Sequence, residues 1–587
     1  MISEKNRVPA WQWVTKIFSK WIGTDEAGTS SKLEPLSPDW HNWSNNISYN
    51  SKGTSYYFMP TNKDELRDAL RQVKRAKENN VEVTVRVSGQ RHSQPPLVIH
   101  DNRDVGDEDP PVFLVDMSCY ADDATGGERL KIDPEDPYRV IMNSGVREDE
   151  LEAFLTNNGN DLMMKTVTAG GSFSLGGITA VDAHGATWQE GIFAETVYSF
   201  TIMNDPDAPE LLEITADDTP LPNGWSPIQF ARVSLGGLGI VTSIKLNVQQ
   251  RALTGGTKCF EYSDEENEKD YFVNNINVLL MGKLGEEDGH DRLEVFFNPY
   301  KEMESQKGFL ALFWDVDEDL ASGTYKTEAE DVNVCEDADN GNGDYGSPII
   351  NIKAVQNIGW YAQFPKGKEL RTAMMNLFMT AIEAVVGRTN ENNLELWYII
   401  PVPPVIFMSY FIPLGDIGPT GLGKAWDALK VVADKVRGSQ QDFYIAGPME
   451  FRFVKGGDTA MSGTYSANPD EYFVNLDLLG FMKADRNEKN NVVDRDDQQR
   501  YEALLEFFAA VEQEWVAMGG FPHHGKMYGF YNPHNLGDKS IRPFNPGFLA
   551  DLRERRGERL TKFKEFCDSM DPDKIFRNKY LTMLLGE

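Results

Sequence analysis

Glu450 and Arg452 stand two positions apart in the mostly apolar segment PMEFRFV, residues 448–454. Alternate residues of a β-strand point to the same face, so a strand here places a carboxylate beside a guanidinium. Such a pair is costly to bury, and it is either an ordinary ion pair between strands or a pair with a chemical task. In the second case the glutamate accepts a proton from a substrate and the arginine stabilises negative charge.

A second group of chemically capable residues follows the segment VEVTVRV, residues 81–87. Its strictly alternating valines predict a strand that is buried on one face. The turn after it, SGQRHS at 88–93, exposes backbone N–H groups that can hold a pyrophosphate, and Gly89 lets a ligand approach closely. His92 then projects beside the bound group, unless it is a structural histidine.

Glycines are dense between residues 166 and 203, where His184 immediately precedes the last glycine of the group Gly170, Gly171, Gly176, Gly177 and Gly185. A loop of this kind lets the backbone approach a large flat cofactor and its phosphates at several points. Another glycine turn, GGLGIV at 236–241, leads into a predicted strand. Each motif is a weak signal alone, but their order along the chain is informative.

In this order the motifs resemble the FAD domain of the vanillyl-alcohol-oxidase and p-cresol-methylhydroxylase (PCMH) type of FAD-linked oxidases. The resemblance covers residues 40–250 and implies an α+β protein with a two-part FAD-binding domain and a large α+β substrate (cap) domain. It implies that FAD is joined covalently through its 8α-methyl group to His92. It further implies a set of residues that line FAD: Ser88, Gly89, Gln90, Arg91, Ser93, Gly170, Gly171, Ser172, Gly176, Gly177, His184, Gly185, Gly239 and Ile240.

Later motifs resemble particular members of this group. The Glu450-x-Arg452 pair is similar to that of type II cholesterol oxidases and of alditol and aldonolactone oxidases, where it sits over the flavin. PHHGK at 522–526 resembles their P-H-W-G-K segment, with His524 in place of the tryptophan and Lys526 near the polar edge of the flavin. The C-terminal segment DPDKIFRNKYL resembles the family ending and adds Asn578 and Tyr580 to the expected cofactor residues.

The resemblance implies an oxidase that removes a hydride from an alcohol carbon to flavin N5 and reduces O2 to hydrogen peroxide. Glu450 is the expected base, with Glu294 of the segment RLEVFFNPY as the alternative, because type II cholesterol oxidases carry a strand acid there. A sterol or similar bulky apolar secondary alcohol is the leading substrate. Open alternatives are an alditol or aldonolactone oxidase, a secondary-metabolite tailoring enzyme, a dehydrogenase, and a catalytically silent flavin- or ligand-binding protein.

Helical and strand patterns suggest how the chain divides. We expect a leader at 1–39, the FAD-binding domain at 40–250, the cap at 251–445, and a C-terminal region at 446–587 that completes the cap and returns to the FAD domain. Helices are predicted at 63–79, 148–157, 368–387 and 497–518. The proline-broken apolar segment at 394–412 suits either core packing or the wall of an apolar cavity.

The bulk composition restricts the partners. A formal net charge of −33 disfavours nucleic acid, whose phosphates the protein would repel. No metal-ligand motif is found, and no segment is apolar over the roughly 18–20 residues of a membrane span. A short amphipathic helix at 11–22 either docks on the protein or contacts a membrane surface weakly. No secretory signal is evident, so a cytoplasmic location is expected.

Overall fold

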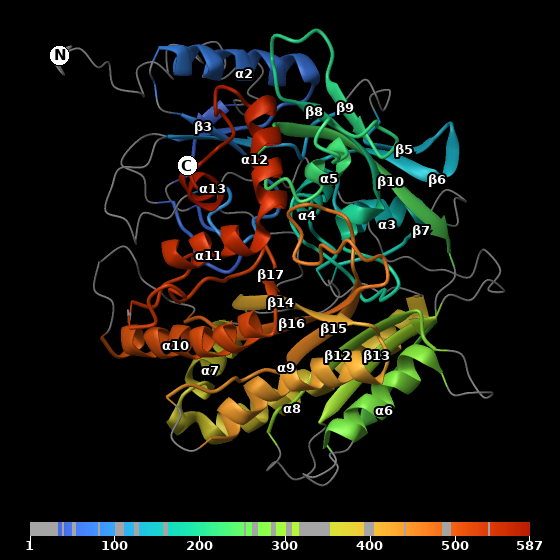
Figure 1. The fold of residues 1–587 in the computed structure, drawn as a ribbon, viewed down its shortest axis with the longest axis vertical. Coiled ribbons are helices and arrows are strands. Elements are labelled where there is room, and N and C mark those ends of the chain that lie inside the picture. Colours follow the sequence, from blue (N-terminus) through green and yellow to red (C-terminus); the bar gives the residue numbers. More distant parts are fainter. Residues whose placement is uncertain are drawn as a thin grey trace.

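The computed structural model is a mixed structure of helices and three β-sheets, and the expected α+β class is confirmed. It describes residues 33–587 except for 38–39, 50–54, 80, 82, 100–110, 122–127, 157–161, 169, 252–253, 261–267, 283–288, 301–307, 316–352, 393–403, 439–441, 484–494 and 538–539. Two of the sheets lie in the upper part of Figure 1, and the third lies below them.

The upper part is built from residues 33–250 and contains a mostly parallel sheet beside an antiparallel one. The first sheet has the order β1-β2-β4-β3, with bounds Leu33–Pro35, Tyr56–Phe58, Val112–Asp116 and Thr84–Ser88. The second has the order β5-β6-β10-β8-β9, and β7 also pairs with β10. Their bounds are Leu130–Asp133, Asp136–Asn143, Ile240–Gln250, Val197–Met203, Leu212–Thr215 and, for β7, Leu162–Met164.

Helix α2, Lys63–Glu78, covers the first sheet as its sequence pattern predicts. Its N-terminus is capped by Asn62, whose side-chain oxygen accepts the Glu65 N–H at 3.0 Å. Its apolar face packs against the sheet through Leu66, Ala69, Leu70, Val73 and Ala76. Three shorter helices, α3, α4 and α5, occupy Glu148–Thr156, Leu175–Thr179 and Pro227–Ala231.

Strand β3 corrects one prediction, because it is buried on both faces. Arg86 lies on the face that alternation assigned to solvent, yet its side chain is only 5% exposed. Its guanidinium donates hydrogen bonds to the carbonyls of Leu97, Leu235, Gly236 and Phe576. A buried cation needs such acceptors, and Arg86 thereby joins β3, the glycine turn before β10 and the C-terminal segment.

The lower sheet contains seven strands among the described residues, in the order β11-β13-β12-β15-β16-β14-β17, all antiparallel. Their bounds are Thr254–Phe260, Phe309–Asp315, Arg292–Phe297, Met449–Lys455, Tyr472–Phe481, Val405–Gly415 and Phe521–Pro522. The described part of the apolar segment 394–412 begins at 404 and forms most of β14, and its remainder lies outside the described residues.

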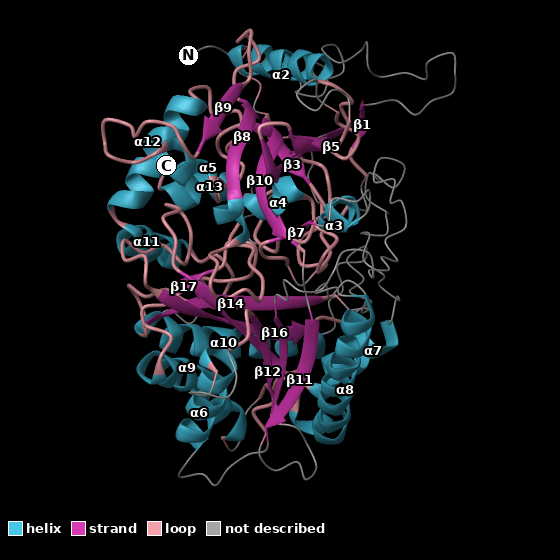
Figure 2. Cartoon of the chain, turned by 90° about the vertical axis from the view of Figure 1, so that its right-hand side faces the viewer, coloured by secondary structure: helices cyan, strands magenta, loops and turns pink. Residues whose placement is uncertain are grey.

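Helices cover the two faces of the lower sheet differently (Figure 2). On one face lie α6, α9 and α10, where Trp426 of α9 packs against Phe272 of α6 and Phe297 of β12. On the other lie α7 and α8, and this is also the face that meets the upper region. The helix bounds are Glu268–Met281 (α6), Lys353–Ala362 (α7), Lys368–Asn392 (α8), Pro419–Arg437 (α9) and Arg495–Ala517 (α10).

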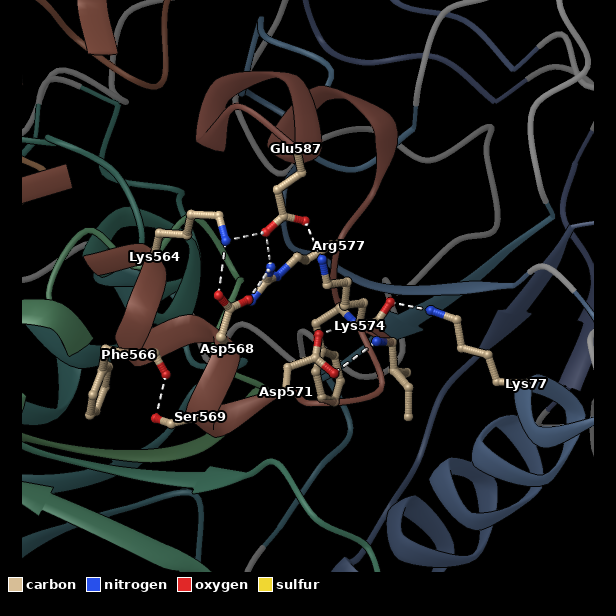
Figure 3. Close-up of polar contacts among 11 residues, drawn as sticks. Lys77, Lys564, Phe566, Asp568, Ser569, Asp571, Lys574, Arg577 and Glu587 are labelled. Carbon is tan, nitrogen blue, oxygen red and sulfur yellow. Dashed lines mark hydrogen bonds and ion pairs between the residues drawn. The ribbon is translucent and has the colours of Figure 1, made fainter. Parts of the chain in front are cut away.

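The chain then returns to the upper region through α11 (Pro546–Arg556), α12 (Glu558–Met570) and α13 (Lys579–Leu585), drawn in red in Figure 1. An ion-pair network fixes this return (Figure 3). Buried Arg577 pairs with Asp568 at 2.7 Å and with Glu587, and Lys574 pairs with Glu587 at 2.8 Å. Just before it, the Ile575 carbonyl accepts the Val85 N–H, so the network braces the edge of β3.

The predicted N-terminal amphipathic helix at 11–22 lies outside the described residues. In the part of the chain that is described, no helix has both the length and the apolar character needed to cross a bilayer.

Candidate active site

A cavity of about 600 Å³ lies where the upper region meets the face of the lower sheet that carries Glu450 and Arg452. One wall comes from the turn after β3, the glycine-dense loop and the start of β10. The opposite wall comes from β12, β14, β15, β16, α8 and the loop after β17. Parts of the chain more than 400 residues apart in sequence therefore form one site.

The wall formed by the lower sheet, α8 and the loop after β17 is called the cap wall below, and the other is called the upper wall. The strand register sets the polar residues of the cap wall in two rows. In one row Glu294 of β12 stands opposite Arg452 of β15, which stands opposite Asn475 of β16. In the next row Glu450 stands opposite Asp477, which stands opposite Ser409 of β14. Because alternate residues share a face, both rows point away from the α6 and α9 side of the sheet.

Arg452 is shared between two carboxylates. Its Nη2 lies 2.5 Å from Glu294 Oε1 and 2.6 Å from Glu450 Oε1, and its Nη1 donates to the carbonyl oxygen of His184 at 3.4 Å. The Glu294 side chain is 2% exposed and is not part of the cavity wall, whereas Glu450 and Arg452 are. Of the two candidate bases, Glu450 is the one that a bound substrate can reach.

Burial controls the protonation of these carboxyl groups more than the neighbouring arginine does. It raises the pKa of Glu450 to about 8, with Arg452 lowering the value and Glu294 raising it again. Arg452 favours the ionised form of Glu450, but desolvation outweighs the arginine. Burial likewise raises the pKa of Asp477 to about 6, and the charge of Glu450 adds to the effect.

Lys526 and two histidines complete this wall. The Lys526 Nζ lies 4.1 Å from the centre of the Phe407 ring, and burial lowers the pKa of its ammonium group. Burial lowers the pKa of His184 to about 3, and it lowers the pKa of His523 as well. Both imidazoles are therefore neutral at pH 7, and the remaining ionisable groups of the cap wall are Glu450, Arg452, Asp477 and Lys526.

His92 projects into the opposite side of the cavity. Its ring stacks on Trp43 with centroids 5.1 Å apart and meets the edge of Phe173 at 4.4 Å. Its Nε2 is buried and has no hydrogen-bond partner among the described residues. Burial lowers the pKa of His92 to about 3, so the imidazole is neutral and keeps a free lone pair.

The cavity wall includes twelve of the residues expected to line the cofactor, namely His92, Ser88, Gly89, Gln90, Arg91, Ser93, Gly170, Ser172, Gly176, Gly177, His184 and Gly239. Arg91 takes a positive φ of 59°, which turns the chain sharply before His92. Behind the turn, a Cβ at Gly89 would lie 2.0 Å from the Ser174 hydroxyl oxygen, so only glycine fits there.

Five expected cofactor residues are not part of the wall. Ile240 points into the core beside β8, and its neighbour Val241 lines the cavity instead. The Gly171 carbonyl accepts the Asp149 N–H, and a Cβ at Gly185 would lie 2.2 Å from the Val167 carbonyl oxygen. Asn578 caps α13 and donates to Pro96, and the Tyr580 hydroxyl is bonded to that of Tyr528.

The segment PHHGK is held by Asp182 of the glycine-dense loop. The Asp182 carboxylate accepts the backbone N–H groups of Gly463 and His524, each at 2.8 Å. His524 is fully buried behind the wall, and its ring meets Tyr528 edge-on at 6.0 Å. The residue that departs from the resembled motif therefore does not face the cavity, whereas His523 and Lys526 do.

Three residues that line the cavity were not predicted from the sequence, namely Asp477, Trp43 and Phe173. The sequence does contain a pattern that could have identified Asp477. Asn475 and Asp477 alternate within the apolar strand EYFVNLDLLG, just as Glu450 and Arg452 alternate in theirs. Trp43 had none, since it lies in a loop about 50 residues before His92, and only the fold brings its N–H to the Arg91 carbonyl and its ring onto His92.

Comparison with known proteins agrees with this architecture. Residues 420–584 match the family described as D-arabinono-1,4-lactone oxidase. The structure is similar to that of a "solvent-stable cholesterol oxidase", with a TM-score of 0.64 and 16% identity over 95% of this chain and 99% of that one. It is also similar to cholesterol oxidase from B. sterolicum, with a TM-score of 0.63 and 14% identity over 96% and 99% of the two chains. No curated protein matches the sequence.

These findings confirm the resemblance to FAD-linked oxidases, with FAD as the supported cofactor. The residues of the upper wall fit that group. The Ser144 and Ser172 hydroxyls and His92 Nε2 are buried polar atoms of the wall without partners among the described residues, and such atoms are costly unless a ligand satisfies them. Gly176 and Gly177 open the same stretch of backbone to a flat ligand.

Gly89→Ala should lower the FAD content of the purified protein severely, because the new methyl group collides with the Ser174 hydroxyl and displaces the turn that carries His92. Adding Ser174→Ala removes the oxygen and leaves a Cβ contact of 3.0 Å, so the double variant should recover part of the flavin. Flavin absorbance per protein measures both. Ser174→Ala alone serves as the control, and normal flavin content in Gly89→Ala contradicts the predicted collision.

Proposed function

Starting from its kinship with the FAD-linked oxidases, we propose that the protein oxidises an alcohol, with a bulky apolar secondary alcohol such as a sterol as the leading substrate. FAD, attached through His92, supplies the acceptor for the hydride, and O2 takes the electrons to form hydrogen peroxide. The observation that carries the proposal is the cavity itself, in which a buried carboxylate–guanidinium pair faces a wall suited to FAD.

Within this proposal Glu450 takes the hydroxyl proton of the substrate through its carboxylate oxygen. Arg452 holds that carboxylate in place and balances negative charge that develops at the substrate oxygen. Lys526 contributes a second positive charge on the same wall. Glu294 stays behind the wall and keeps the guanidinium oriented through its 2.5 Å contact.

The apolar part of the cap wall supports a bulky substrate. Leu377, Phe378, Ala381 and Ile382 follow one another along one side of α8 and line the cavity together with Phe296 and Leu479. Leu377 is 53% exposed, so this apolar strip runs from the interior to the surface. A path of this kind suits a rigid hydrocarbon skeleton better than a polyol, whose hydroxyl groups would lose their water without gaining partners.

A second candidate is an aldonolactone- or alditol-type oxidase, and the match of residues 420–584 to the D-arabinono-1,4-lactone oxidase family favours it. That stretch includes Glu450, Arg452, Asp477 and Lys526, and all four polar groups could bind the hydroxyls of a small sugar-like substrate. The two candidates share the chemistry and differ in what the α8 wall contacts.

Glu450→Gln should slow anaerobic flavin reduction by roughly 100–1,000-fold, because the variant keeps the shape of the wall and loses the proton acceptor. Arg452 retains Glu294 as a partner, so the fold should survive. In the unaltered protein the reduction rate should rise with pH through about 8, where Glu450 loses its proton, and the variant should lose this dependence. Stopped-flow spectroscopy measures the step directly.

The matched control is Glu135→Gln in the exposed turn between β5 and β6, which should change neither the rate nor its pH dependence. If Glu450→Gln reduced its flavin at the normal rate, the proton acceptor would have to be sought among the other carboxylates of the wall.

His92→Ala should yield protein whose FAD is released into the supernatant by trichloroacetic acid, whereas the unaltered protein should keep its yellow colour in the pellet. The reason is that the free Nε2 lone pair of His92 is the candidate for the covalent bond. His184→Ala is the control, because this second cavity histidine should leave the bond intact. Flavin that stays with precipitated His92→Ala would overturn the assignment and implicate His184.

A substrate panel separates the two candidate functions. Sterols and other bulky secondary alcohols should reduce the flavin with far higher kcat/KM than alditols or aldonolactones, because the α8 wall offers apolar contacts. Phe378→Asp should weaken sterol turnover mainly through KM and leave the reaction with small alcohols nearly unchanged. Efficient turnover of small polyols, with no response to sterols, would favour the alditol- or aldonolactone-type function.

A further inference from the structure

Asp477 is a cavity residue that the proposed reaction leaves unused. It stands directly opposite Glu450 in the antiparallel pair of β15 and β16, and both side chains line the cavity. Directly opposed residues bring their Cβ atoms to about 4.5–5.5 Å, and two like charges at that distance destabilise a sheet. Strand register therefore holds two carboxyl groups together that would repel each other if both were ionised.

The groups around this pair do not compensate two negative charges. From β12 and β15, Glu294 and Arg452 face it, but Arg452 already contacts both glutamates. From β16 and β14 come the neutral Asn475, Ser409 and Phe407. From the loops come neutral His184 and His523, and Lys526.

Lys526 does not form an ion pair with Asp477, because among the described residues no cation lies within 4.0 Å of that carboxylate. Its Nζ lies over the Phe407 ring, and Asp477 Oδ1 is buried without a hydrogen-bond partner in the described part of the chain. Three carboxylates therefore face two cations, which leaves one excess negative charge in a place with little water. An uncompensated buried charge is expensive, and the least costly remedy is to bind a proton.

We infer that Glu450 and Asp477 hold one proton between them in the resting protein, and that Asp477 is a positioning residue that sets when Glu450 can accept a proton. This inference rests on the proposed role of Glu450 and adds a second carboxyl group to it. With one proton, the pair carries one negative charge, and Glu294 carries another. The positive charges of Arg452 and Lys526 balance these two. The oxygen that lacks the proton can accept one from a substrate hydroxyl group.

A consequence follows for the isosteric variant Asp477→Asn. It removes a negative charge next to Glu450, and a like charge is what disfavours ionisation of a carboxyl group. Glu450 should then lose its proton at lower pH in the variant. Removal of an acidic residue should thus increase the fraction of Glu450 that is ionised, and able to accept a proton, in mildly acidic solution. The loss of a merely structural hydrogen-bonding group would not do this.

The first test needs no substrate. Infrared difference spectra, native protein minus variant at pH 7, should show the carbonyl stretch of a protonated carboxyl group for both variants, at close to full intensity for Glu450→Gln and at reduced intensity for Asp477→Asn, where Glu450 is only partly ionised at this pH. Other buried carboxyl groups, such as Glu148 and Glu512, cancel in the difference. Asp477→Glu keeps the pair and should show little difference. A band that persists unchanged in Asp477→Asn overturns the shared proton.

The second test follows flavin reduction against pH. In Asp477→Asn the acid limb should move to lower pH by roughly one unit, so the rate at pH 6 should rise about tenfold. Asp477→Glu should keep the limb near its native position, and Glu135→Gln should not move it. An unmoved limb in Asp477→Asn overturns the inference. A normal rate in Glu450→Gln would instead overturn the proposed function, and the infrared spectra would still decide the carboxyl pair.

Discussion

A guanidinium ion that is removed from water must be surrounded by acceptors, and Arg452 imposes this requirement on the whole cap wall. Its two carboxylate partners lie on different strands, Glu294 on β12 and Glu450 on β15, and its third contact is the His184 carbonyl of the upper region. A slip of one residue between β12 and β15 would turn Glu294 into the apolar layer around Trp426. The contacts of Arg452 thus constrain the register of β12 against β15, the position of Glu450, and the packing of the lower sheet against the loop that contains His184.

The sequence was sufficient wherever a local pattern decides the structure. Helix α2 forms with the predicted apolar face and an Asn62 cap, because spacing and capping act within a few residues. The pairing of Glu450 with Arg452 could also be predicted, since alternation along one strand needs no knowledge of its neighbours. The turn that carries His92 and the glycine-dense loop could each be recognised for the same reason, since each is a local backbone feature, and both line the cavity.

What failed depended on neighbours distant in the sequence. Arg86 was expected to face solvent, but the C-terminal segment and the turn before β10 cover it and supply its acceptors. Ile240 was expected at the cofactor, but the register of β10 against β8 turns it inward and turns Val241 to the cavity. The pKa of Glu450 depends on Arg452 two residues away and on desolvation by the surrounding protein, and the larger of the two effects, desolvation, cannot be read from the sequence around Glu450.

The two walls of the cavity solve different electrostatic problems. On the upper wall, glycines and serine hydroxyls such as Ser144 and Ser172 present dipoles to the cavity, beside the charged side chains of Arg86, Arg91 and Asp116. Dipoles of this kind can hold a large polar cofactor without the desolvation cost of buried ions. On the cap wall the charges are concentrated on adjacent strands, where each costs desolvation energy and must be offset by another. A carboxylate in such a cluster can be neither freely ionised, as in water, nor permanently neutral. Its protonation is set by the balance of its neighbours, and that is the property a group needs if it is to take up and release a proton in each turnover.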